Sequence, residues 1–150
     1  SIYTNTPDGD VPKLLYNGFR KALHPMYKFD SAPEKRFTIV CEQSPEVIKW
    51  LRPAPKQFNL YYGNSQRYEP DFVVETENTM YLVEIKGEDK LNDETNLMKK
   101  QRAVRYCEVA SVYCSAHNLK EWKYLYIPSQ QVQTNTSFAM LAQRFAVTKN

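Results

Sequence analysis

The chain has 150 residues, of which 42% are hydrophobic and 25% charged, and this is enough for one globular domain with its own core. A formal net charge of +3 and a pI near 8.7 are compatible with nucleic acid as a partner. The sequence holds no apolar run long enough to span a membrane, no signal peptide and no C-x-x-C pair among its three cysteines. We therefore expect reduced thiols, a cytoplasmic location and no membrane partner. Because residue 1 is not methionine, we also expect either a domain taken from a longer chain or a processed protein.

Residues 1–29 are predicted to form an N-terminal extension, which begins as a polar segment with Pro and Gly. A helix is predicted within it over residues 12–23, because apolar side chains recur there at helical spacing after a proline. Gly18 weakens this helix by about 1 kcal/mol. Pro25 sets its end.

The main domain is predicted to span residues 30–150 and to start with a helix that continues to about residue 42. Asp30-Ser31 supplies the N-cap, and a proline follows just inside the helix. Glu34 lies in the first turn, where the helix dipole favours an acidic side chain. The residues predicted to face the core are Phe37, Val40 and Cys41.

The next stretch is predicted as a short helix followed by a strand. The helix covers residues 44–51 and is ended by prolines. Residues 58–62 alternate between apolar and polar side chains, which predicts a strand, and residues 63–66 are predicted as the turn after it. This strand would be the first of three in an antiparallel meander.

A β-hairpin is predicted at the centre of the chain, where the apolar runs 72–74 and 80–83 flank the turn residues 77–79. If the turn has two residues, Asp71 lies directly opposite Glu84, with Cβ atoms about 5 Å apart on the same face of the sheet. A three-residue turn would shift the pairing by one residue.

Two carboxylates and an amine are therefore expected at one place, because Glu84 and Lys86 lie two residues apart and share a face. Two ionised carboxylates so close repel each other unless a cation lies between them, and Mg²⁺ prefers oxygen ligands of this kind. Alternatively, Glu84 with Lys86, or Asp71 with Arg67, forms an ordinary surface ion pair that contributes little energy.

A long helix is predicted from a cap at Asn92 or Asp93 to about Ser115. Small residues recur along it at helical spacing and favour close packing on a sheet; they are Ala103, Cys107, Ala110 and Cys114. If the helix starts above the hairpin, Lys100 or Gln101 should point toward it. The other basic residues of this helix are predicted to be solvated or to contact DNA phosphates, and they are Lys99, Arg102 and Arg105.

Residues 122–127 predict a strand closed by Pro128, and the preceding helical crossover allows it to lie parallel to a strand of the meander. After a polar loop, Thr136-Ser137 caps a last helix whose apolar stripe comprises Phe138, Leu141, Ala142 and Phe145. The order of helix, three strands, helix and strand indicates an α/β fold with an αβββαβ core, in which helices flank a mixed central sheet.

Pro70-Asp71 followed by Glu84-Ile85-Lys86 resembles the signature of the PD-(D/E)XK nuclease superfamily, and the spacing of 13 residues from Asp71 to Glu84 fits the hairpin of that family. Over about residues 30–127 the chain is similar to the C-terminal endonuclease domain of type III restriction-enzyme Res subunits. The residues that carry this similarity are Lys49-Trp50, Phe58-x-Leu60-x-Tyr62, Tyr68-x-Pro70-Asp71-Phe72 and Leu82-Val83-Glu84-Ile85-Lys86-Gly87.

The resemblance implies a restriction-endonuclease-like fold and DNA phosphodiester hydrolysis that depends on Mg²⁺, with Mn²⁺ as a substitute. Asp71, Glu84 and the backbone carbonyl of Ile85 would bind the metal. Lys86 would orient or deprotonate the attacking water, or offset the charge that develops on the phosphate. The resemblance also gives the site three further candidate members, which are Glu34, Lys100 and Gln101. The DNA-contacting residues would be Lys99, Lys100, Arg102, Arg105 and Arg67.

The partners implied are double-stranded DNA, a helicase/ATPase domain of the parent chain and a methyltransferase/specificity subunit. The motor would lie outside these 150 residues, because they contain no G-x-x-x-x-G-K-[ST] phosphate loop. Two other functions stay open. The chain could be a non-catalytic module that binds nucleic acid or a partner, or a structural domain that docks a helicase to its methyltransferase.

Overall fold

The structure is a computed structural model that describes residues 1–54, 60–62 and 66–147. For residues 62 and 66 it describes the backbone but not the side chain. Its elements, with η for a 3-10 helix, are η1 (Asp8–Lys13), α1 (Ala32–Gln43), β1 (Val47–Leu51), β2 (Leu60–Tyr62), β3 (Gln66–Tyr68), β4 (Phe72–Thr76), β5 (Thr79–Lys86), η2 (Glu88–Lys90), α2 (Glu94–Ala116), β6 (Glu121–Pro128), η3 (Ser129–Gln131), α3 (Phe138–Phe145) and β7 (Ala146–Val147).

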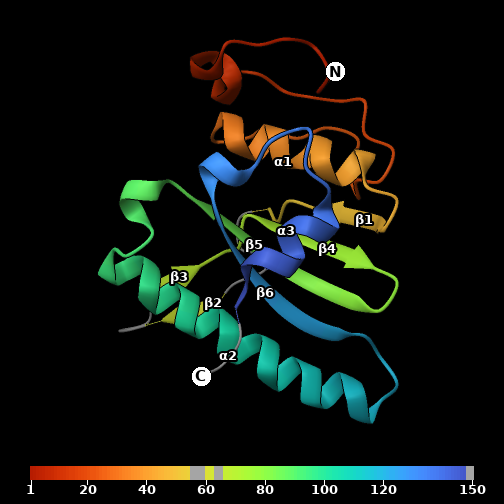
Figure 1. The fold of residues 1–150 in the computed structure, drawn as a ribbon, viewed down its shortest axis with the longest axis vertical. Coiled ribbons are helices and arrows are strands. Elements are labelled where there is room, and N and C mark those ends of the chain that lie inside the picture. Colours follow the sequence, from red (N-terminus) through yellow and green to blue (C-terminus); the bar gives the residue numbers. More distant parts are fainter. Residues whose placement is uncertain (55–59, 63–65, 148–150) are drawn as a thin grey trace.

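Five strands form the central sheet in the order β1-β4-β5-β6-β7, and β2 and β3 form a separate two-stranded sheet. Neighbouring strands of the central sheet are antiparallel except β5 and β6, which are parallel. Apart from the β2–β3 pair, the order α1, β1, β4, β5, α2, β6 is the predicted one (Figure 1). The α/β class, with helices flanking a mixed sheet, is therefore confirmed.

The central sheet separates two apolar cores. One core lies between the sheet and α1, α3 and the N-terminal segment, and it includes Ile2, Val11, Tyr16, Phe29, Phe37, Val40, Phe72, Val83, Ile127 and Phe138. The other lies under α2 and the β2–β3 pair, and it includes Leu60, Tyr68, Val73, Leu82, Ala103, Cys107, Tyr124 and Tyr126. Strand β5 serves both cores, because successive side chains of a strand point to opposite faces.

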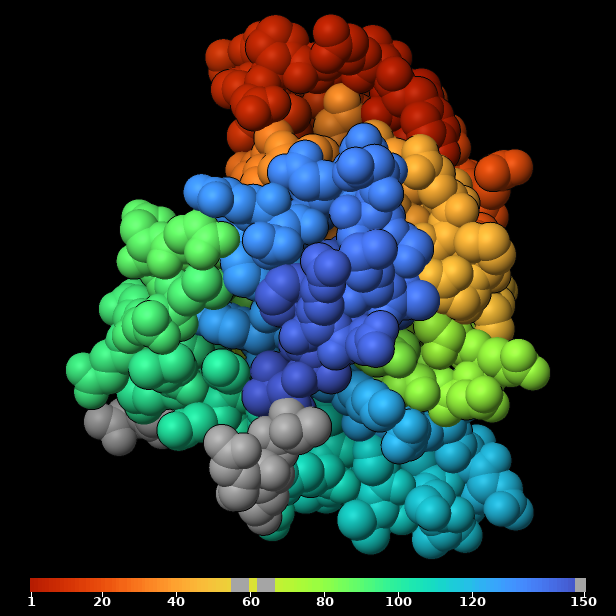
Figure 2. Space-filling view, viewed as in Figure 1, coloured from red at the N-terminus to blue at the C-terminus, as the bar shows by residue number. Residues whose placement is uncertain are grey.

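The N-terminal segment does not form the helix predicted over residues 12–23. After η1 the chain runs extended, and Tyr16 and Tyr27 exchange two backbone hydrogen bonds of 2.9 and 3.0 Å. Gly18 has a φ of +90°, which interrupts a helix and which residues other than glycine rarely adopt. The segment covers α1 at one end of the molecule, in red in Figure 2.

The short helix predicted over residues 44–51 is also wrong, because most of this stretch is strand β1. Val47 and Ile48 are β-branched, and pairing with β4 gives their backbone a hydrogen-bonded partner that local sequence cannot reveal. The outer edge of β1 is covered in turn by the N-terminal segment. Trp50 donates its backbone N–H to Lys21 O and accepts from Leu23 N, each at 3.0 Å.

The strand predicted over residues 58–62 exists from Leu60 onward, whereas residues 58 and 59 lie outside the described part of the chain. It pairs with β3 and does not open the three-stranded meander, a place that β1 takes. Of the turn predicted over residues 63–66, residues 63–65 lie outside the description and Gln66 begins β3.

The C-terminal half follows the predictions closely. Asp93 occupies the N-cap position of α2, although its side chain makes no capping hydrogen bond with the described residues, and three of the four small residues of this helix are buried, namely Ala103, Cys107 and Cys114. Strand β6 runs parallel to β5. The Ser137 hydroxyl accepts the backbone N–H of Met140 and caps α3. Among the described residues, no helix combines the length and apolar character needed to cross a membrane.

Candidate active site

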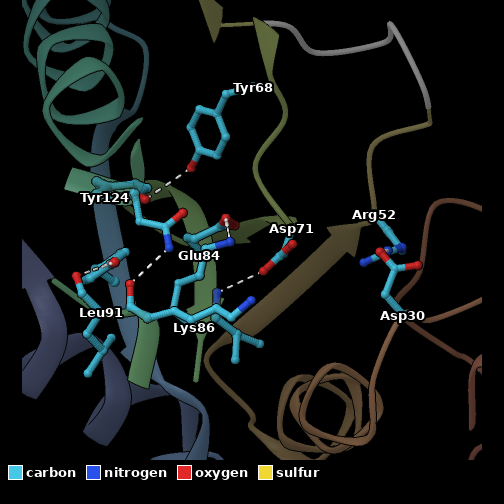
Figure 3. A network of polar contacts seen from close by, with 12 residues as sticks. Asp30, Arg52, Tyr68, Asp71, Glu84, Lys86, Leu91 and Tyr124 are labelled. Atoms are coloured by element: carbon cyan, nitrogen blue, oxygen red, sulfur yellow. Dashed lines mark hydrogen bonds and ion pairs between the residues drawn. The ribbon is translucent and has the colours of Figure 1, made fainter. Parts of the chain in front are cut away.

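The β4–β5 hairpin sets the geometry of the site. Phe72 pairs with Val83 and Glu75 with Met80, which is the register expected from a two-residue turn. Continued by one residue, this register places Asp71 opposite Glu84. Asp71 Oδ2 accepts the backbone N–H of Ile85 at 2.8 Å, so its carboxyl group lies against the second strand (Figure 3).

Lys86 lies beside this carboxylate pair, by which we mean Asp71 and Glu84. Its Nζ is 3.3 Å from Glu84 Oε1, with 24% of its side chain exposed against 5% for Glu84. The second oxygen of Glu84, Oε2, is buried, and the described residues offer it no donor unless Asp71 is protonated, in which case the two carboxyl groups share a hydrogen bond. Buried carboxylate oxygens are normally hydrogen-bonded, so an unpartnered one leaves a position open for a donor or a cation.

The pKa values of both carboxyl groups are raised above their ordinary values. Burial and then the charge of Glu84 raise the pKa of Asp71 well above its ordinary range, and Arg52 offsets this only in part. Burial also raises the pKa of Glu84, but Lys86 limits the effect. The two carboxyl groups consequently titrate as a pair, and a neighbouring cation would favour the form in which both are ionised.

The amine of Lys86 is held in its charged form. Burial by itself would lower its pKa, but the charges of Glu84 and Asp71 outweigh burial, and the net pKa is raised. In this state Lys86 is an ammonium donor rather than a free base. It can therefore stabilise negative charge at a group placed next to the pair.

This donor set fits a divalent cation. Two facing carboxyl groups, one with an unpartnered buried oxygen, would gain a compensating charge from a hard ion with oxygen ligands. Within the described part of the chain, no three His, Cys, Asp or Glu side chains gather into a metal-binding group. The predicted ligand set does not require one, because its third member is the backbone carbonyl of Ile85.

Glu34 is brought to the same region by the first turn of α1. It is 7% exposed, its Oε1 accepts the backbone N–H of Asp30 at 2.9 Å, and Arg52 Nη1 lies 2.7 Å from the same oxygen. Burial, and next the charge of Asp71, raise the pKa of Glu34 to about 7. Arg52 therefore contacts two acidic side chains, Glu34 and Asp30, because its Nη2 donates a hydrogen bond to Asp30 Oδ2 at 2.8 Å.

The side chains of helix α2 that face the site lie one position earlier in the sequence than the prediction allowed. Lys99 Nζ lies 5.8 Å from the ring centroid of Tyr68, and its charge lowers the pKa of Glu84. Lys100 Nζ lies 4.8 Å from the ring centroid of Tyr126. Gln101 is exposed on the helix surface. Of the two residues expected to face the hairpin, Lys100 is the one at the site.

The remaining basic candidates lie on the surface. Arg102 and Arg105 are placed on α2 away from the pair, and Arg105 Nη1 is 3.4 Å from Glu108 Oε2. Arg67 is exposed on β3, opposite Tyr61. These positions allow contact with a large anionic partner but do not place these side chains at the carboxylate pair.

Sequence reasoning missed the site roles of Arg52 and of three tyrosines. The Tyr68 and Tyr124 hydroxyls lie 3.0 Å apart, and burial, followed by the charge of Glu84, raises both pKa values far above the ordinary one. The alternation of Tyr124 and Tyr126 along a strand parallel to β5 is a usable signal, since both have to share one face. The sequence carries no comparable signal for Arg52, because the residues before it favour a helix and so predict the wrong direction for this part of the chain.

Comparison with known proteins adds no assignment: neither protein-family models nor the curated proteins searched gave a match.

Proposed function

We propose that this chain is a metal-dependent endonuclease domain that hydrolyses DNA phosphodiester bonds. The observation that carries the proposal is the carboxylate pair with Lys86 beside it: Asp71 meets the backbone of Ile85 at 2.8 Å, and Glu84 meets Lys86 at 3.3 Å. This is the arrangement that the resemblance to PD-(D/E)XK nucleases anticipates. The buried oxygen Oε2 of Glu84, which the described residues supply with no donor while Asp71 is ionised, is consistent with a cation at the pair.

Each residue of the proposed site has its own role in binding the metal, the water or the phosphate. Asp71, Glu84 and the carbonyl of Ile85 would hold Mg²⁺, or Mn²⁺ in its place. When bound, the ion would supply Lewis-acid polarisation of the phosphate and a more acidic water. Lys86, held as an ammonium, donates hydrogen bonds to the attacking water and offsets the charge that grows on the phosphate oxygens. Lys100 and Lys99 add positive charge at the entrance of the site.

The proposed substrate is double-stranded DNA, with the chain acting as the cleavage domain of a type III restriction enzyme Res subunit. The support for this placement is the resemblance of the motifs within residues 30–127 to that family, together with the observed element order. A helicase/ATPase domain in the parent chain and a methyltransferase/specificity subunit are the proposed partners.

Plasmid cleavage tests the proposal. The chain should convert supercoiled DNA to nicked or linear forms with Mg²⁺ or Mn²⁺, and EDTA should stop it. Asp71→Ala and Glu84→Gln should abolish cleavage, and Lys86→Ala should lower the rate by roughly 10²–10³-fold, the usual effect of removing one electrostatic donor. Lys49→Ala, an exposed lysine of β1, is the matched control and should cut normally.

Retained nicking by a folded Asp71→Ala variant would reject these assignments. If the wild-type chain neither cuts nor binds Mn²⁺ in a Glu84-dependent way by calorimetry, the non-catalytic binding module becomes the better description. In that description the 3.3 Å contact of Glu84 with Lys86 is a fixed ion pair.

A further inference from the structure

Two consecutive lysines at the start of α2 each rest on the face of a tyrosine ring. Lys99 Nζ is 5.8 Å from the centroid of Tyr68, and Lys100 Nζ is 4.8 Å from that of Tyr126. Consecutive residues of a helix diverge by about 100°, so their side chains do not ordinarily serve one site. Here the two rings come from different elements, β3 and β6, and receive the diverging lysines separately.

Both rings adjoin the carboxylate pair. Tyr126 is the register partner of Glu84 across the parallel β5–β6 ladder, so the two side chains are neighbours on one face. Tyr68 reaches the same face through the 3.0 Å contact between its hydroxyl and that of Tyr124, which is the register partner of Leu82. The rings therefore receive the two lysines on the face of the sheet that carries Glu84, and the charge of Lys99 acts on that carboxylate.

The rings are themselves fixed in place. Tyr126 is 8% exposed, and its hydroxyl donates to Leu91 O at 2.8 Å. A second hydrogen bond fixes the segment that contains Leu91, because Asn96 Nδ2 donates to the neighbouring carbonyl, Lys90 O, at 2.9 Å. Tyr68 is 4% exposed. A lysine held on a rigid ring loses less side-chain freedom when it binds a ligand.

A ring face also differs from a carboxylate as a partner for lysine. It attracts the ammonium group through its quadrupole and brings no net negative charge of its own beside the lysine. A carboxylate in the same place would neutralise the lysine and add a third acidic group next to Asp71 and Glu84.

We infer that Tyr68 and Tyr126 are positioning residues that hold Lys99 and Lys100 as a two-pronged clamp for neighbouring phosphates of the bound DNA strand. This inference rests on the proposed nuclease function. It extends that function by assigning Tyr68 and Tyr126 the task of aiming two lysines that the resemblance places among the DNA contacts.

The first test needs no activity. NMR of protein with ¹³C-labelled lysine should show ring-current shifts of the side-chain methylenes of Lys99 and Lys100. Tyr126→Phe should keep the shift of Lys100 because the ring remains, and Tyr126→Leu should remove it. The same pair of substitutions at Tyr68 should act on Lys99. Unshifted lysines in the wild-type protein, or shifts that survive the Leu substitutions, would overturn the inference.

The second test measures DNA binding against salt in EDTA. Tyr126→Leu should weaken binding about 5- to 20-fold and reduce the slope of log K against log salt by about one phosphate contact, whereas Tyr126→Phe stays within about 3-fold of wild type. In the Tyr126→Leu background, Lys100→Ala should cause little further loss, because the pair acts as a unit. Equal losses from Lys100→Ala in both backgrounds would show that the ring does not position the lysine.

A lysine–tyrosine contact of the same kind, remote from the site, provides the matched control. Lys35 Nζ lies 4.9 Å from the ring centroid of Tyr16, in the core on the α1 side of the sheet. Tyr16→Leu should leave DNA binding and its salt slope unchanged. If the wild-type chain shows no Mg²⁺-dependent cleavage but the shifts and slopes behave as described, the proposed nuclease function fails and the lysine clamp stands.

Discussion

Replacing Asp71 by asparagine should stabilise the metal-free protein while abolishing cleavage. Asp71 faces Glu84 across the hairpin, and residues in such positions have Cβ atoms about 5 Å apart. Two unit charges at about 5 Å and an effective dielectric constant of about 20 repel by about 3 kcal/mol. The asparagine oxygen can still accept the N–H of Ile85, so the substitution removes the repulsion and keeps the hydrogen bond.

The effect has a definite pH dependence. The pKa of Asp71 is raised in the folded protein, chiefly by burial and then by Glu84, above its ordinary value of 3.8. The folded state therefore binds the proton more tightly than the unfolded chain, and wild-type stability falls as pH rises from about 4. The asparagine side chain does not titrate, so the advantage of Asp71→Asn should grow from near zero at about pH 4 toward about 3 kcal/mol in the alkaline range.

Urea unfolding in EDTA at several pH values between about 4 and 9 measures this difference. Repeating the series with Mg²⁺ adds a second readout, because a ligand at about 100 times its Kd stabilises the folded state by about 2.7 kcal/mol. Wild type should gain this stability and Asp71→Asn should not. Glu77→Gln, an exposed carboxylate in the hairpin turn, is the control and should show neither effect. A difference that is flat with pH, or an equal response to Mg²⁺, would refute the reasoning.

Three other predictions concern groups outside the carboxylate pair. Burial raises the pKa of Glu34 to about 7 from 4.5, so in EDTA wild type should lose up to about 3 kcal/mol relative to Glu34→Gln as pH rises through that window; parallel unfolding curves would contradict this. Burial raises the pKa of Cys41 well above the ordinary range and that of Cys107 to about 12, so iodoacetamide at about pH 8 should modify both only after unfolding, as mass spectrometry can check. Ser137→Ala removes the cap on Met140 N and should lower the free energy of unfolding by about 1 kcal/mol, while Ser137→Asp keeps it; equal stability of the two variants would argue against the cap.

The hairpin and the meeting of its charged residues could be predicted because they depend on local information. Alternation fixes which side chains share a face, and a two-residue turn fixes the register, so Asp71 and Glu84 follow from counting. Strand β1 could not be predicted in this way. A capping serine and a proline favour a helix at residues 44–51, and only the ladder with β4 reverses that preference.

The lysines of α2 illustrate a second limit. One residue of error in the phase of a helix rotates a side chain by about 100°, which is enough to exchange a residue that faces the site with one that faces solvent. The sequence predicted Lys100 or Gln101; the structure places Lys100 and Lys99 there and leaves Gln101 exposed. Arg52 and Glu34 are about 18 residues apart in the sequence, and tertiary packing brings them together. No local sequence pattern predicts their 2.7 Å contact.

The alternation that gathers the charged groups on the α2 side of the sheet separates them from the core on the α1 side. Phe72 follows Asp71 and Ile85 follows Glu84, and both apolar side chains point into the core on the α1 side of the sheet. Each charged residue is therefore backed by a buried neighbour that faces the opposite way. Substitutions of Asp71 or Lys86 leave that core intact, and this is why a folded but inactive protein, rather than an unfolded one, is the expected result of changing them.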